Sequence, residues 1–151
     1  MDTALYDIHN LHHLKKGPFL GIDWGRKRVG IALSNPENTV AMPFAVVGSG
    51  GMLRTTLNQL WRDYHVQALI IGWPLHARGT QSTLCANILR LAQRLTQDHN
   101  WPIALWDERF TTRGVNAVMI ENKSIIDHHA AALILEGALQ RWHNIKNHPM
   151  P

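Results

Sequence analysis

Residues 19–34 read FLGIDWGRKRVGIALS, and this stretch is the most informative part of the sequence for the fold. Two short apolar runs, residues 19–23 and 28–33, flank a turn that contains Gly25. Apolar runs joined by a glycine-containing turn are typical of a β-hairpin. The stretch therefore predicts two neighbouring strands, with Asp23 at the end of the first one.

Strands and helices alternate after this hairpin. Apolar runs predict three more strands, at residues 40–47, 66–72 and 102–106. Apolar side chains recur with helical spacing in three segments, residues 53–64, 84–95 (capped by Thr80, Ser82 or Thr83) and 127–142, and a short helix is expected from residue 111 or 112 to about 120. Three strands in a meander followed by alternating helices and strands predict an α/β sheet of mixed direction.

The chain of 151 residues suffices for one domain with its own hydrophobic core. Residues 1–17 lack sustained periodicity and are expected to form a loosely held extension. Residues 18–143 are expected to form the domain, and residues 144–151 a tail. With Cys85 as the single cysteine, a disulfide framework or zinc knuckle within the chain is excluded. No signal peptide or membrane span is recognisable, so we expect a cytoplasmic protein without a membrane partner.

The charge is mildly basic. Fifteen Lys and Arg residues exceed eleven Asp and Glu residues, which leaves a formal net charge of +4. This excess is compatible with a nucleic-acid partner but does not require one.

The few acidic residues fall at informative places. Asp23 ends the first predicted strand, Asp107 and Glu108 end the last one, and Asp127 opens the last helix. If the first and last strands lie near each other in one sheet, carboxylates from distant parts of the chain converge. Mg²⁺ prefers such oxygen ligands, and two ions about 4 Å apart can activate a water and stabilise the leaving oxygen of a phosphodiester.

Each acid also has an ordinary explanation. Asp23 close to a glycine favours a turn, and Asp107 with Glu108 can form a solvated loop. Asp127 suits a helix N-cap. Spacing alone does not decide between these explanations and a metal site.

Four local motifs favour the metal site over these ordinary explanations. They are GIDWGRKRVGIALS at 21–34, IIGWPLHARGTQS at 70–82, WDERFTT at 106–112 and IDHHAAALIL at 126–135. In this order they resemble the motifs of the YqgF/RuvX family of nucleases and cover most of residues 18–142. The resemblance implies a ribonuclease H-like fold with the sheet order 3-2-1-4-5.

The resemblance also implies an acidic metal site. Asp23, Glu108 and Asp127 would be the catalytic, metal-binding acids for Mg²⁺ or Mn²⁺, with Asp107 as an alternative ligand to Glu108. Arg28 and Arg109 would be substrate-binding or structural arginines. In the loop of the second motif, His76 and Arg78 are candidates for phosphate contacts.

The function implied is that of a two-metal hydrolase that processes the 5′ end of precursor 16S ribosomal RNA, on its own or on a ribosomal particle. Alternatives are a resolvase of Holliday junctions or other branched DNA, and a non-catalytic RNA-binding assembly factor. One departure from the family's pattern lowers the expected electrostatic affinity for the substrate. Relatives carry a longer and more basic segment before the last motif, whereas residues 114–126 contain only Lys123.

Two tryptophans stand beside the first two motifs. Trp24 and Trp73 could stack on bases, or they could cover the edge of the sheet. We favour the second explanation.

Overall fold

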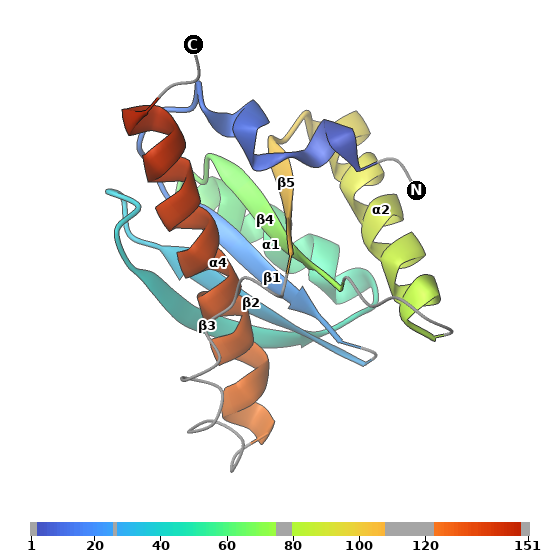
Figure 1. The fold of residues 1–151 in the computed structure, drawn as a ribbon. Coiled ribbons are helices and arrows are strands. Elements are labelled where there is room, and N and C mark those ends of the chain that lie inside the picture. Colours follow the sequence, from blue (N-terminus) through green and yellow to red (C-terminus); the bar gives the residue numbers. More distant parts are fainter. Residues whose placement is uncertain (1–2, 26, 75–79, 108–122, 149–151) are drawn as a thin grey trace.

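A five-stranded sheet forms the centre of the molecule, in the order β3-β2-β1-β4-β5 (Figure 1). The computed structural model describes residues 3–25, 27–74, 80–107 and 123–148, with the backbone only for 80–82 and 123–128. The strands are β1 (Phe19–Trp24), β2 (Arg28–Ser34), β3 (Ala41–Gly48), β4 (Ala68–Trp73) and β5 (Ile103–Asp107). Pairs β1–β2 and β2–β3 are antiparallel, while β1–β4 and β4–β5 are parallel. The mixed sheet and its predicted order are confirmed.

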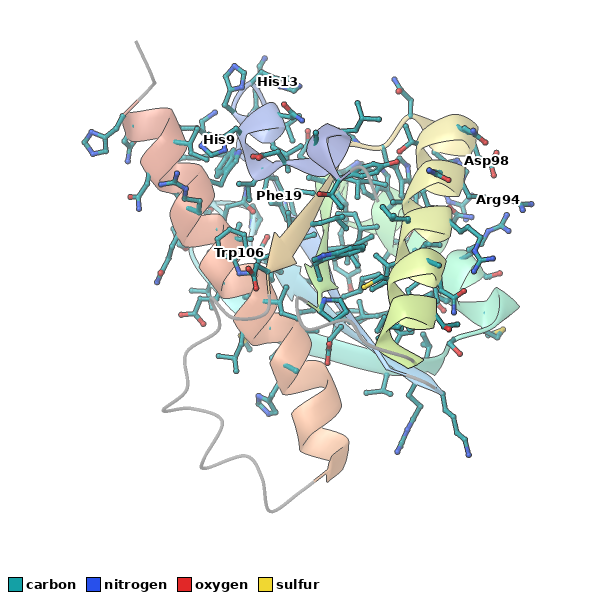
Figure 2. All side chains as sticks on the ribbon, turned by 45° about the vertical axis from the view of Figure 1, so that its right-hand side comes forward. His9, His13, Phe19, Arg94, Asp98 and Trp106 are labelled. Atoms are coloured by element: carbon teal, nitrogen blue, oxygen red, sulfur yellow. The ribbon has the colours of Figure 1, made fainter. Side chains whose placement is uncertain are left out.

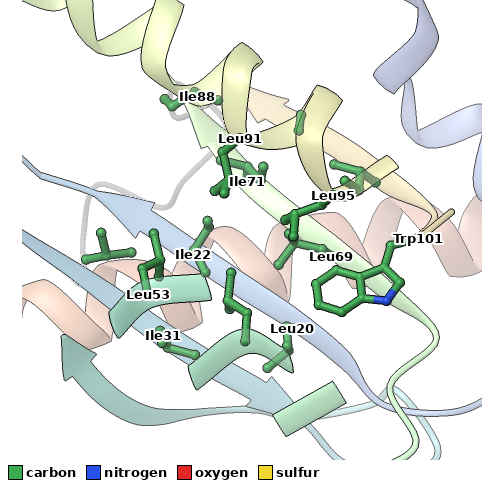
Figure 3. Close-up of a cluster of buried hydrophobic side chains, with 14 of the residues drawn as sticks. Leu20, Ile22, Ile31, Leu53, Leu69, Ile71, Ile88, Leu91, Leu95 and Trp101 are labelled. Carbon is green, nitrogen blue, oxygen red and sulfur yellow. The ribbon is translucent and has the colours of Figure 1, made fainter. Parts of the chain in front are cut away.

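Helices cover both faces of this sheet. Helices α1 (Gly51–Asp63) and α2 (Thr80–His99) lie on one face, and α4 (Lys123–Asn147) crosses the other (Figure 1). Alternation along the strands explains the two cores, because successive side chains point to opposite faces. Leu20 and Ile22 of β1 pack with Leu53 of α1 and Leu91 of α2 (Figure 3). Phe19 packs in the second cluster, beneath α4.

Helix α4 approaches the sheet closely because glycines face it. A Cβ added to Gly21 would lie 2.8 Å from Leu135 Cβ and 3.1 Å from the carbonyl oxygen of Ala131. A Cβ on Gly72 of β4 would lie 2.6 Å from Ile134 Cδ1. The glycines of the first two motifs therefore set the distance between α4 and the central strands.

The start of α4 differs from the sequence prediction. The helix begins at Lys123, so Asp127 is its fifth residue and not its N-cap. It also continues to Asn147, which leaves little of the predicted tail at 144–151. The expectation rested on a capping preference, and the backbone of residues 123–126 continues the helix beyond that point. The short helix expected near residues 111–120 lies outside the described residues.

The N-terminal segment also differs from the expectation for residues 1–17. Residues 3–17 include two 3₁₀ turns, Ala4–Tyr6 and Ile8–Leu11, whose Tyr6, Ile8 and Leu11 side chains are buried. The indole Nε1 of Trp142 donates a hydrogen bond of 2.8 Å to the carbonyl oxygen of Leu11. These contacts bind the segment to β5 and α4. Anchors without regular spacing carry no periodic signal, which explains why the pattern missed them.

Within the part of the chain that the structure describes, no helix has the length and apolar character needed to cross a membrane.

Candidate active site

The predicted site lies where the parallel strands end. Strands β1, β4 and β5 run in the same direction, so Asp23, Trp73 and Asp107 approach one edge of the sheet, which we call the carboxyl edge. Ile71 of β4 pairs with both Ile22 and Leu105. Asp23 is thus one residue, and Asp107 two residues, beyond a shared rung of the sheet. Ligand sites in open α/β sheets typically form at such an edge.

The two aspartates nevertheless belong to different faces. Gly21 faces α4, and Asp23 follows it by two residues, so strand alternation puts Asp23 on the α4 face. Trp106 belongs to the hydrophobic cluster beneath α4. Its neighbour Asp107 therefore falls on the opposite face, in register with Trp73. Both aspartates are half-buried.

Helix α4 runs antiparallel to β1 across this face. Phe19 at the start of β1 packs on Trp142, with ring centroids 5.1 Å apart. Two residues further along β1, Gly21 faces Ala131 and Leu135. Two more strand residues, about 6.6 Å, reach Asp23, and one more turn of helix, about 5.4 Å, reaches position 127. These spacings predict that position 127 of α4 lies near the level of Asp23.

A tight turn fixes the end of β1. The amide of Gly25 donates a 2.8 Å hydrogen bond to the carbonyl oxygen of Arg28, and a Cβ on Gly25 would lie 2.8 Å from that same oxygen. Asp23 pairs with Gly30 across the hairpin. Arg28 begins β2 at the carboxyl edge and is exposed. The hairpin therefore holds one acid and one cation of the first motif at the same edge.

The other predicted site residues lie outside the described residues. These are Glu108, Arg109, His76 and Arg78, together with the side chain of Asp127. Within the described part of the chain, no group of three or more His, Cys, Asp or Glu side chains is positioned to hold a metal ion. Of the predicted metal ligands, Asp23 and Asp107 are thus the two whose side chains the structure describes.

The tryptophans beside the motifs pack against the core. Trp24 and Trp73 are both partly buried against the hydrophobic cluster beneath α1 and α2. This supports their role in covering the end of the sheet. Trp24 also forms a wall of a groove on that face.

This groove contains residues that the sequence reasoning did not select. It has a volume of about 670 Å³ and extends from the carboxyl edge between α1 and α2. Its lining includes Arg54 of α1 with Arg90 and Arg94 of α2. Arg90 and Arg94 are one helical turn apart, which could have indicated a shared face. Their proximity to Arg54 depends on tertiary packing.

Comparison with known proteins identifies the family. A family model described as "RuvX: Holliday junction resolvase" matches residues 17–141. The chain belongs to the RuvX family. It is 36% identical over 141 residues to an Orientia tsutsugamushi (strain Ikeda) protein named "Putative pre-16S rRNA nuclease", covering 88% of this chain and 90% of that one. A Caulobacter sp. (strain K31) protein of the same name is 34% identical over 139 residues, covering 85% of each chain.

Solved structures show the same fold. The RuvX-family chain is similar to RuvC of T. thermophilus in complex with a Holliday junction substrate, with a TM-score of 0.58 and 12% identity over 85% of this chain and 94% of that one. The fowlpox virus Holliday junction resolvase gives a TM-score of 0.50 and 16% identity, over 84% and 99% of the two chains. The fold is therefore ribonuclease H-like, as the motifs predicted.

Proposed function

We propose that this RuvX-family chain is a metal-dependent nuclease that processes the 5′ end of precursor 16S ribosomal RNA. Asp23, Glu108 and Asp127 are its catalytic carboxylates in this proposal. The proposal rests on the close passage of α4 over Gly21, from which we infer that position 127 of the helix lies at the level of Asp23. Like charges brought together in this way raise one another's pKa unless a cation compensates them.

The donor set suits Mg²⁺ or Mn²⁺. Asp23 offers a half-buried carboxylate at the carboxyl edge, and carboxylates of this kind are hard oxygen ligands. Asp23, Glu108 and Asp127 would hold the metal, with two ions as the expected number. When bound, the metal supplies water activation and stabilisation of the leaving oxygen.

The chain's own residues orient the substrate around these acids. Strand pairing with Gly30 fixes the backbone of Asp23 at the carboxyl edge, where we propose that its carboxylate contacts the metal. Arg28 at the same edge is proposed to bind a phosphate, and Arg109, His76 and Arg78 are proposed to do the same from the adjoining segments.

Strand alternation favours Glu108 over Asp107 as the third ligand. Asp107 lies on the face of α1 and α2, in register with Trp73, whereas Asp23 lies on the α4 face. In this proposal Glu108 is therefore the third ligand, and Asp107 is the alternative.

RNA is the preferred substrate in this proposal because the relatives are named "Putative pre-16S rRNA nuclease", and the match to them covers most of their length. A branched DNA junction is the second candidate, since the family description and the RuvC complex both name Holliday junctions. We further propose that the protein acts in the cytoplasm on RNA presented by a ribosomal particle. A third possibility, a non-catalytic RNA-binding assembly factor, predicts binding without cleavage.

The deciding experiment offers both substrates to the purified protein. A labelled precursor 16S RNA fragment and a four-way DNA junction are incubated with Mg²⁺, with Mn²⁺ and with EDTA. We expect metal-dependent cleavage of the RNA at one site. Cleavage of the junction alone would assign the resolvase activity, and binding without any cleavage would assign the assembly factor.

A further inference from the structure

A line of cationic side chains follows the groove between α1 and α2. Asn87, Arg90 and Arg94 recur at i, i+3 and i+7 on one side of α2, and Arg54 of α1 faces them across the groove. None of the described residues lining this groove is acidic. The groove therefore carries a concentrated positive charge, in contrast to the mild net charge of the whole chain.

The arginines are held by weak partners. Nη2 of Arg90 donates to Oδ1 of Asn87 at 2.7 Å. Nη2 of Arg54 and Nε of Arg94 lie 3.9 Å and 3.6 Å from the same atom, Oδ2 of Asp98. Arg94 and Asp98 lie together on α2 (Figure 2). The side chains of Arg54 and Arg94 are 43% and 61% exposed. Exposed ion pairs of this kind stabilise by little, so an incoming phosphate can replace Asp98 as the partner of the guanidinium groups.

The groove opens beside the candidate active site. Its wall at the carboxyl edge consists of Trp24, directly after Asp23, and of the backbone at Gly25 and 49–51. From Thr83 to Arg94 the groove follows twelve residues of α2, and the eleven rises of 1.5 Å between them amount to about 16 Å. At about 3.4 Å of strand axis per phosphate, several consecutive phosphates fit along it.

The backbone around the mouth leaves room for a strand. A Cβ added to Gly48, Gly50 or Gly51 would meet no atom within 4 Å. Helix α1, thirteen residues long, starts at Gly51 without a side-chain cap. The helix dipole at this end adds to the positive potential of the groove.

We propose that the α1–α2 groove binds the sugar-phosphate backbone of the substrate strand on one side of the cleaved bond. This proposal rests on the proposed nuclease function, because continuity with the carboxyl edge selects a nucleic-acid strand as the occupant. The groove supplies the electrostatic contacts that residues 114–126 lack. A strand bound here passes Trp24 at the edge and reaches Asp23 on the α4 face.

The test removes two positive charges from the groove and compares the effect on binding with that of removing two positive charges elsewhere. Arg90→Ala/Arg94→Ala is compared with Lys15→Ala/Lys16→Ala, whose exposed lysines lie before β1, at the opposite edge. Both double variants lower the net charge by two. Binding of a labelled single-stranded precursor 16S fragment is titrated at several salt concentrations in Ca²⁺, and the melting temperature of each variant is recorded.

We expect the groove variant to lose affinity about tenfold or more at low salt, with a slope of log affinity against log salt shallower by about 1.4–1.8. The lysine variant should keep nearly the wild-type slope. Equal losses in the two variants, or an unchanged slope in the groove variant, would overturn the groove as the binding surface.

Two further arms separate this proposal from the nuclease function. Asp23→Asn should abolish cleavage and keep the wild-type salt slope. If the wild-type protein cleaves nothing, the nuclease function fails, while the comparison of slopes still tests the groove. The same titration with a four-way DNA junction identifies the strand. A slope change seen with the junction alone would overturn RNA as the occupant.

Discussion

The two faces of the sheet reach the carboxyl edge with opposite chemistry. On the α4 face, Gly21 and Gly72 permit a close helix, and an acid, Asp23, is the second-last residue of the central strand. On the other face, α1 and α2 stand apart and line their groove with Arg54, Arg90 and Arg94. A single layer of strands thus separates the closely packed face from the open cationic groove.

This division follows from the alternation of strand residues. Asp23 lies on the α4 face, and the next residue of β1, Trp24, lies on the opposite face and forms a wall of the α1–α2 groove. A nuclease needs both surfaces close together, because carboxylates repel the phosphates that they must approach. Cations on the opposite face attract the strand without neutralising the carboxylates directly.

The largest expected effect comes from removing the acid of the α4 face. Asp23→Asn keeps the side-chain shape and loses the charge, so cleavage should fall by more than about a hundredfold, beyond the 10–100-fold typical of residues that only support metal ligands. The melting temperature without metal should change by a few degrees at most. Initial rates of Mg²⁺-dependent cleavage check this. Unchanged rates in the pure variant would refute the role of Asp23.

The close approach of α4 provides the second test. Gly21→Ala places a methyl group 2.8 Å from Leu135 Cβ, and overpacking of this kind costs about 1–3 kcal/mol of unfolding free energy. Because α4 must move away, cleavage should fall as well. Denaturant unfolding and the cleavage rate are measured together.

Two other glycines serve as graded controls for Gly21→Ala. Gly72→Ala meets the flexible end of Ile134 at 2.6 Å and should cost less. Gly48→Ala meets no atom within 4 Å and should be nearly neutral. Equal stability in all three variants would contradict the argument that Gly21 sets the position of α4.

The third test concerns position 127. Since α4 begins at Lys123, Asp127→Ala removes no N-cap, and alanine is the better helix former. Without metal the variant should therefore melt close to the wild type. Mn²⁺ that binds only the folded protein raises its melting temperature by mass action, and the variant should lose most of that rise. An equal rise in both proteins would exclude Asp127 as a ligand.

Much of the fold could be predicted from the sequence because apolar periodicity reports the faces of strands and helices. The run at residues 19–23 and the spacing of Leu53, Leu57 and Leu60 led to β1 and α1, each within about two residues of the observed bounds. The N-terminal segment could not be predicted in this way. Tyr6, Ile8 and Leu11 are buried by neighbours that are distant in sequence.

The site was predictable only in part, for a related reason. The end of a strand identifies Asp23, but the separation of Asp23 and Asp107 onto opposite faces depends on counting residues from a known rung of the sheet. The predicted start of α4 was four residues too late. Asp127 is a residue type that often caps helices, but here it lies inside the helix. The groove was missed because Arg54 and Arg90 come from different helices.

The smallest expected effect is an increase in RNA affinity when the acidic partner of the arginines in the α1–α2 groove is removed. Asp98 forms ion pairs with Arg54 and Arg94 and so competes with phosphate for both guanidinium groups. Asp98→Asn removes this competitor, and because exposed ion pairs contribute about 0.2–1 kcal/mol, RNA affinity should rise about two- to fivefold at low salt. Asp63→Asn is the matched control, since Asp63 is exposed at the far end of α1 and its loss changes the net charge equally. The control should show a smaller rise that reflects net charge alone. A rise of the same size in both variants would mean that the arginines beside Asp98 contribute only to the overall charge. The α1–α2 groove would then bind RNA no better than the rest of the surface does.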